Sequence, residues 1–284
     1  MIPRPLRLRC PDCHGVAIES AGGGHHCGGC GRTFPLQSGV LLALPASFSG
    51  EATANLEYYN AMSADPEGLL LVRERTRNYE KKGEAAMTAL GLDTSSPRQT
   101  VLEIGCGSSG HGAAIHAAGH EYVGQDISPH LLIQARQRHR ELADALLVAG
   151  DATNIPFDDG CFDGVFCVAS LHHLPAPERG ICEMLRVLRP GGAFSFMEPK
   201  RFYPTQVIQA LTHPRTEVSW LRTSVRNVTR WVKERGVAEC HVEHRIYTPN
   251  GPRPLVPLFD RVDRFCARWR FAMLSVTFQV WGRK

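Results

Sequence analysis

Short apolar runs alternate with amphipathic stretches through the middle of the chain, and this alternation predicts strands that are each followed by a helix. The expected strands span 101–104, 122–125, 146–149, 162–169 and 193–197. The expected helices span 69–92, 110–118 and 177–188, and a further one begins at Pro129 behind Ser128 as its N-cap. This order predicts an α/β fold with a doubly wound sheet that binds ligands at the carboxyl ends of its strands.

The pattern changes after residue 199. An amphipathic helix is expected over 217–235, an Arg- and aromatic-rich helix over 259–271, and two final strands over 242–247 and 274–280. Residues 51–64, near the other end, are polar with two tyrosines and receive no assignment. We expect residues 199–284 to determine substrate specificity, because this part follows the last parallel strand.

Charge divides unevenly along the chain. Residues 200–284 hold 16 Lys and Arg against 6 Asp and Glu, a net charge of +10, whereas residues 1–199 carry a net charge of −6. The basic part favours an acidic partner: an anionic small molecule, RNA or an anionic membrane surface touched peripherally. A solvated, Arg-rich helix face is an equally good interpretation. The sequence does not specify an oligomeric state.

Composition is that of a globular protein of 284 residues, with 43% hydrophobic and 21% charged residues. No apolar run approaches the roughly 18 residues that a membrane span needs. The first residues contain Arg and Pro but no apolar core, so no secretory signal is expected. Six of the ten cysteines are scattered without a pairing pattern, which favours a reducing compartment. We therefore expect a cytoplasmic protein.

The other four cysteines form two C-x-x-C knuckles, Cys10-Pro-Asp-Cys13 and Cys27-Gly-Gly-Cys30. Each knuckle directs two thiolates to one point, and two knuckles complete a closed tetrahedral site, which predicts structural zinc. The segment between them, 15–26, suits a short hairpin. The alternatives to a four-cysteine zinc site are a site in which a nearby histidine replaces one cysteine, a ribbon without metal and a redox-active pair of knuckles. The predicted module spans residues 1–48.

A glycine-rich turn follows the first central strand, in Glu103-Ile-Gly105-Cys106-Gly107, and Gly110 comes three residues later. Glycines there allow main chain to approach a nucleotide-like ligand closely. Asp126, at the end of the next strand, can accept hydrogen bonds from both hydroxyls of a ribose. NAD and S-adenosylmethionine (SAM) sites share these devices, so the turn alone leaves the ligand undecided.

Later segments resolve that ambiguity through a resemblance. Four segments follow the turn in order: Gly150-Asp151-Ala152, Phe162-Asp163, Leu171-His172-His173-Leu174 and Leu188-Arg-Pro-Gly-Gly192. With Glu103–Gly107 and Gln125-Asp126, they resemble the class I SAM-dependent methyltransferases related to quinone-biosynthesis methyltransferases, over about residues 55–200. Residues 8–45 resemble the small zinc-ribbon proteins that activate tRNA and protein methyltransferases. The resemblance implies a Rossmann-like, seven-stranded methyltransferase domain over 49–284, with SAM and structural zinc.

The resemblance also implies roles for individual residues. Glu103 would orient the glycine turn or bind the amino group of SAM through water, and Asp126 would hold the ribose. Tyr58 or Tyr59 could close over the sulfonium, although packing in the core is an equal alternative. The complete set implied to contact SAM is Glu103, Gly105, Cys106, Gly107, Gly110, Asp126, Ile127, Asp151, Ala152 and Tyr59.

The need for a catalytic base depends on the acceptor. Methyl transfer needs a base only when the acceptor is a poor nucleophile such as a hydroxyl. His173 and then His172 are the candidates, and Glu198 is a further polar group near the acceptor. The predicted reaction methylates a hydroxyl or amine of a small-molecule, natural-product or glycan- or lipid-linked acceptor. The alternatives are methylation of rRNA or tRNA, NAD-dependent oxidoreduction and a non-catalytic SAM-binding scaffold.

Overall fold

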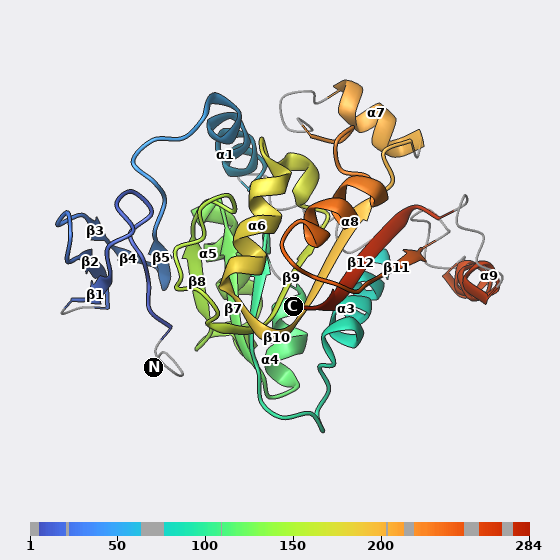
Figure 1. Cartoon of the computed structure of the whole chain (residues 1–284), viewed down its shortest axis with the longest axis horizontal. Coiled ribbons are helices and arrows are strands. Elements are labelled where there is room, and N and C mark those ends of the chain that lie inside the picture. Colours follow the sequence, from blue (N-terminus) through green and yellow to red (C-terminus); the bar gives the residue numbers. More distant parts are fainter. Residues whose placement is uncertain are drawn as a thin grey trace.

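The computed structural model describes residues 6–20, 23–63, 77–108, 110–202, 204–212, 219–246, 256–268 and 275–284. A twisted central sheet is flanked by a small ribbon at one end, next to the N-terminus, and by C-terminal helices at the other (Figure 1). The sheet has the order β11-β12-β10-β9-β6-β7-β8-β5-β4. Its strands are β4 (Leu36–Gln37), β5 (Val40–Leu42), β6 (Thr100–Ile104), β7 (Glu121–Asp126), β8 (Leu146–Ala149), β9 (Phe162–Val168), β10 (Leu188–Pro199), β11 (Cys240–Arg245) and β12 (Thr277–Arg283).

The predicted Rossmann-like sheet is confirmed. Strands β6 to β10 pair in parallel, while β12 runs antiparallel between β10 and β11. Every residue of β6 is buried, as expected for a strand with helices on both faces. The chain reverses its strand order between β6 and β9, which places the ends of β6, β7, β8 and β9 around one crevice.

Helices cover both faces of the sheet. Helices α3, α4 and α5 pack on one face, whereas α6 and α8 pack together on the other. Helix α1 lies against α5 at the carboxyl edge of the strands. The helices are α1 (Gly50–Ser63), α3 (Arg77–Leu90), α4 (Gly110–Ala117), α5 (Pro129–Arg138), η1 (Arg140–Leu142), η2 (Leu171–His173), α6 (Pro177–Val187), α7 (Pro204–Thr212), α8 (Val225–Lys233) and α9 (Val256–Arg268).

Helix α1 is the main element that the sequence pattern does not predict. Its apolar positions follow no helical period, so tertiary contacts stabilise it rather than an amphipathic face. Ser49 precedes it, and the Ser49 hydroxyl accepts a hydrogen bond of 3.2 Å from the backbone N–H of Ala52. The helix then packs on α5.

Several predicted bounds also differ. The helix expected over 217–235 forms only as α8, because Ser224 caps it by accepting the N–H of Asn227 at 3.3 Å. The helix expected over 69–92 is described as α3, and its first part lies outside the described residues. The last strand, expected over 274–280, extends to Arg283, and the preceding helix begins at Val256.

The ribbon is continuous with the central sheet. Its own small sheet contains β1 (Ala17–Glu19), β2 (His25–Cys27) and β3 (Thr33–Phe34), so the hairpin expected between the knuckles forms. Beyond it, β5 pairs in parallel with β8, and β4 adds to the outer edge. The module predicted over residues 1–48 thus supplies two strands that extend the seven-stranded sheet to nine.

Apolar packing joins the ribbon to the same core. Leu6, Leu8 and Phe34 are buried in the cluster that also contains Phe157 and Phe162 beneath α6. An isolated bridge pairs Leu8 with Phe157. The ribbon therefore covers part of the face that α6 and α8 cover farther along. Among the described residues, no helix has the length and apolar character that crossing a bilayer requires.

Candidate active site and metal centre

A cavity of about 240 Å³ lies at the carboxyl ends of β6 to β9, beneath α1. The structure brings nine of the ten predicted SAM contacts to it, together with His173; the tenth, Gly110, begins α4 and does not line it. His172 and Tyr58 are not among its lining residues either. The predicted residues that line it are Tyr59, Glu103, Gly105, Cys106, Gly107, Asp126, Ile127, Asp151, Ala152 and His173.

The glycine turn needs its glycines for two reasons. Gly105 has a φ of 68° and Gly107 a φ of 52°, in the left-handed region that side chains disfavour. A Cβ at Gly105 would also lie 2.5 Å from the Cβ of Ser170, which follows β9. The turn and the end of β9 are therefore in close contact across the cavity.

Asp126 fixes the turn from the neighbouring strand. One carboxylate oxygen accepts the N–H of Gly107 at 2.8 Å, and the other accepts the N–H of Ser128 at 2.9 Å. The residue is 8% exposed and lines the cavity. A carboxylate has about four lone-pair sites, so each of its oxygens can accept more than one hydrogen bond.

Glu103 is held by protein groups. Its carboxylate lies 2.9 Å from Nδ1 of His111 and accepts the Tyr122 hydroxyl at 2.7 Å, and the residue is 1% exposed. His111 lies in the first turn of α4 and fits there because Gly83 of α3 has no side chain: a Cβ would meet its ring at 2.5 Å. Of the two predicted roles for Glu103, this geometry favours orienting the segment that follows the glycine turn.

Two further cavity residues have unsatisfied polar atoms. Asn55 of α1 donates to the carbonyl of His173 at 2.6 Å, but its Oδ1 is buried without a partner. Both side-chain polar atoms of Gln125, next to Asp126 on β7, are also buried and unpartnered. Such groups cost free energy unless a ligand or water satisfies them. The cavity thus suits a ligand rich in hydrogen-bonding groups, as SAM is.

Gln125 and Asn55 differ in whether a sequence pattern points to them. Gln125 is a polar residue at the end of an apolar strand, which is a usable signal of a ligand contact. Asn55 lies in the segment without an assignment, and only the folding of α1 over the cavity reveals it.

The two histidines occupy different environments. His173 lines the cavity and packs edge to face on Tyr59, with ring centroids 5.6 Å apart. His172 is 4% exposed, and its Nδ1 lies 2.5 Å from a carboxylate oxygen of Glu198. The other oxygen of Glu198 accepts the N–H groups of Ser170 and Leu171 at 3.0 and 2.8 Å. Glu198 therefore fixes the chain where it leaves β9.

Lys82 of α3 is a polar group that the sequence analysis missed. Burial lowers the pKa of its ammonium, and the nearby carboxylate of Glu198 opposes that shift. Glu198 of β10 thus interacts with the imidazole of His172 and acts electrostatically on Lys82 of α3. No local motif links Lys82 to Glu198, since 115 positions separate them along the chain.

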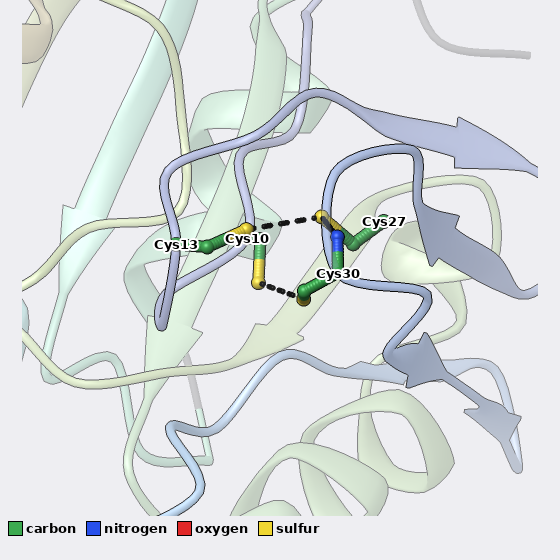
Figure 2. A group of neighbouring side chains, drawn as sticks. All are labelled: Cys10, Cys13, Cys27 and Cys30. Carbon is green, nitrogen blue, oxygen red and sulfur yellow. Dashed lines mark hydrogen bonds between the residues drawn. The ribbon is translucent and has the colours of Figure 1, made fainter.

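The four predicted metal ligands converge in the ribbon (Figure 2). The Sγ atoms of Cys10 and Cys30 are 3.7 Å apart, those of Cys13 and Cys27 are 3.3 Å apart, and all four lie within 4.8 Å of one another. Zinc–sulfur bonds of about 2.3 Å in a tetrahedron place sulfur atoms about 3.8 Å apart. The cluster therefore fits zinc, and no histidine belongs to it among the described residues.

Backbone groups favour the thiolate form of Cys27. The N–H groups of Cys30 and Gly29 point at Sγ of Cys27 at 3.4 and 3.3 Å. The N–H of Cys30 is the largest cause that lowers the pKa of Cys27, to about 6, because it stabilises the charged form. Thiolate is the form that binds metal.

The cluster is connected to the cavity through one loop. Pro11, inside the first knuckle, accepts a hydrogen bond of 2.5 Å from the side chain of Asn154. Asn154 follows Asp151, whose carboxylate accepts the N–H and hydroxyl of Thr153 at 2.7 and 2.9 Å. Arg9 forms an ion pair of 2.5 Å with Asp158 at the end of the same loop. The first knuckle thus braces the loop that carries Asp151 and Ala152.

Comparison with known proteins explains this architecture. Residues 102–196 match the family described as the methyltransferase domain. This segment, about a third of the chain, is similar to a methyltransferase domain. The matched segment runs from β6 to β10 and includes the glycine turn, Asp126, Asp151 and both histidines. The resemblance to SAM-dependent methyltransferases that the sequence motifs predict is therefore confirmed.

Curated relatives match a part of the chain, and each match covers about two fifths of it or less. A phthiotriol/phenolphthiotriol dimycocerosates methyltransferase of Mycobacterium tuberculosis is 39% identical over 100 residues, which cover 34% of this chain and 37% of that protein. A demethylmenaquinone methyltransferase of Beutenbergia cavernae is 37% identical over 108 residues, covering 38% and 42%. A fatty-acid O-methyltransferase of Mycolicibacterium smegmatis is 38% identical over 119 residues, covering 41% and 42%. The chain thus spans about two fifths of the length of these relatives.

Solved structures share the fold over more of the chain. The geranyl diphosphate C-methyltransferase of Streptomyces coelicolor has a TM-score of 0.60 at 17% identity, covering 84% of this chain and 99% of that one. That structure contains S-adenosyl-L-homocysteine. A complex of the Trm112 methyltransferase activator of Haloferax volcanii with a putative methyltransferase has a TM-score of 0.55 at 21% identity, covering 79% and 96%. The methyltransferase domain therefore has the fold of SAM-dependent enzymes.

Asp126 gives a direct test of the cofactor assignment. Replacing Asp126 with asparagine should weaken SAM binding by about 1–3 kcal/mol, because charge-assisted hydrogen bonds to ribose hydroxyls are lost. Isothermal titration calorimetry with SAM measures the change, and Glu141→Gln on the exposed surface serves as the control. An Asp126→Asn protein that binds SAM like the parent would contradict the ribose assignment.

Proposed function

We propose that the chain transfers the methyl group of SAM to a hydroxyl or amine of a lipid-linked or small-molecule acceptor. The observation that carries the proposal is the joining of three features in one cavity: the glycine turn, the Asp126 carboxylate and the imidazole of His173. The named substrates of the curated relatives, a phthiotriol dimycocerosate, a demethylmenaquinone and a fatty acid, support an apolar acceptor.

The cavity residues would bind different parts of SAM. SAM, when bound, supplies a methyl group already activated by its sulfonium. Gly105 and Gly107 would hold its amino acid part, Asp126 its ribose, and Ile127, Asp151 and Ala152 its adenine. The unpartnered amides of Asn55 and Gln125 would complete its hydrogen bonds. Holding donor and acceptor in line while excluding water accounts for most of the rate of such a displacement.

His173 would accept the proton of the acceptor, because its side chain lies in the cavity wall. His172, buried against Glu198, would act as a positioning residue that holds His173 and the end of β9. The two imidazole rings lie with their centroids 4.0 Å apart, so His172 limits the orientations open to His173.

His173→Asn tests this assignment. Loss of a general base should lower kcat about 100-fold or more, while the Kd for SAM changes little, because the other cavity residues remain. The acidic limb of the pH–rate profile should also disappear, since an imidazolium cannot accept a proton. A variant that retains that limb would assign the proton transfer to another group.

The acceptor itself is identified by labelling. The protein is incubated with SAM carrying a labelled methyl group and with separate lipid, small-metabolite and RNA fractions of its host. Label in the lipid or small-metabolite fraction is the expected result. The alternative of rRNA or tRNA methylation stays a prediction of the sequence, and label confined to RNA would establish it instead.

A further inference from the structure

Exposed apolar side chains concentrate in the C-terminal part. Of the ten large hydrophobic residues exposed among the described residues, seven follow residue 200. Three of these, Leu258, Val262 and Phe265, lie on α9 and are 53%, 38% and 57% exposed. Two more, Ile208 and Leu211, project from α7 at 61% and 73% exposure. Figure 1 places both helices in the half of the molecule away from the ribbon.

The exposed residues of α9 form one stripe. At 3.6 residues per turn, Leu258, Val262 and Phe265 lie within about 60° of one another around the helix axis. A helix of a globular protein usually turns such a stripe inward. Here Cys266, on the adjoining face, is buried, whereas each of the three residues of the stripe is at least 38% exposed.

Ion pairs explain why α9 has this orientation. Its two acidic residues, Asp260 and Asp263, face Lys81 of α3; the Asp260 carboxylate lies 2.9 Å from the ammonium, and Asp263 also pairs with it. These three side chains are largely buried, with 14%, 13% and 23% exposure. The acidic side of the helix is thereby fixed against the domain, and the apolar side must face outward.

The outward face also carries positive charge. Arg261, Arg264 and Arg268 are exposed and lie beside the apolar stripe, within about 60° of one another. With both aspartates turned inward, no acidic residue of α9 offsets these three charges on the outer face. An apolar stripe beside a row of arginines is the pattern of a helix that lies in the interface of an anionic membrane.

We propose that α9 binds the surface of an anionic lipid bilayer, with Leu258, Val262 and Phe265 inserted and the three arginines on the headgroups. The arginines alone would suit RNA equally well, but phosphate contacts give no reason for three exposed apolar side chains next to them. A second copy of the chain would present the same basic face, and two such faces repel each other. An anionic bilayer offers an apolar interior to the stripe and negatively charged headgroups to the arginines. The same surface would bring the protein to lipid-linked acceptors.

The test is flotation of the full chain with vesicles of equal parts phosphatidylglycerol and phosphatidylcholine, compared with phosphatidylcholine alone. The parent protein should float with the anionic vesicles and be released by added salt, because headgroup attraction is screened. Neither SAM nor an acceptor is needed, so failure here is distinct from failure of methyl transfer.

Variants locate the contact. Leu258→Ser and Val262→Ser should each weaken vesicle partitioning about tenfold, and Arg261→Gln with Arg264→Gln should weaken it about 25-fold at low salt. Two exposed controls should bind like the parent: Ile18→Ser on β1 of the ribbon, 50% exposed, and Arg226→Gln with Arg235→Gln near α8. Thermal melting confirms that each variant is folded.

Four outcomes would overturn the proposal. In the first, the parent does not bind vesicles; in the second, it binds them and the α9 variants bind equally well. In the third, the chain binds RNA in a salt-sensitive way that the arginine variants lose, and it binds no vesicles. In the fourth, the chain forms a concentration-dependent dimer that Leu258→Ser dissociates.

Discussion

Replacing Gly105 with alanine is expected to abolish measurable SAM binding, a loss of at least about 100-fold, because two costs add at this position. The φ of 68° is unfavourable for any residue with a side chain. The new Cβ would also lie 2.5 Å from the Cβ of Ser170, which cannot swing away as the end of a long side chain could. Either the glycine turn or the end of β9 must shift, and both line the cavity. Calorimetric titration with SAM measures the loss.

Two companion variants separate these costs. Gly119→Ala, at a φ of 90° with no atom near its Cβ and outside the cavity, should lose about 1 kcal/mol of stability and no SAM affinity. Combining Gly105→Ala with Ser170→Gly removes the colliding Cβ and should restore part of the affinity. If the single variant binds SAM normally, the turn does not contact the cofactor.

The second large effect is expected from Cys10→Ser, which removes one of the four thiolates. Structural zinc contributes roughly 12 kcal/mol to the folding of such a site, so losing one ligand should cost about 3 kcal/mol or more. Because the ribbon shares its core with the central sheet, the melting temperature of the whole chain should fall, by about 6 °C or more. Elemental analysis should find one zinc per parent chain and less than one per variant chain.

The same variant should weaken SAM binding about fivefold, although Cys10 is not part of the cavity. The first knuckle holds Asn154 through the carbonyl of Pro11, and Asn154 belongs to the loop that carries Asp151. Cys161→Ser, which removes a half-buried thiol outside the cluster, is the matched control. Two results would contradict the assignment: a parent protein without zinc, or a Cys10→Ser protein as stable as the parent.

The ribbon is joined to the central sheet as well as to the loop of Asp151. Here β5 of the ribbon pairs directly with β8, the strand that ends at Gly150. Because the ribbon and the sheet belong to one chain, forming the contacts between them does not cost the entropy of bringing two separate molecules together. Within one chain, the ribbon is therefore attached to the side of the cavity that Gly150 and Asp151 line.

Sequence alone determined the parts of this protein that depend on local spacing. Alternating apolar runs specify the central parallel sheet, since each strand must be buried on both faces. The glycine turn, Asp126 and Asp151 follow from their positions at strand ends, because parallel strands present their carboxyl ends at one edge. The knuckles Cys10-x-x-Cys13 and Cys27-x-x-Cys30 specify a four-sulfur cluster, because each turn fixes two thiolates.

Tertiary structure decided what depends on segments far apart in the chain. Helix α1 forms without a helical period of its own, and its packing brings Asn55 to the cavity. Pairing of β5 with β8 and the bond from Asn154 to Pro11 connect the ribbon and its four-cysteine cluster to the loop of Asp151. The orientation of α9 is set by Lys81, nearly 180 positions earlier. Periodicity shows that a helix has an apolar stripe, but only its partners in space determine whether that stripe faces the core or the solvent.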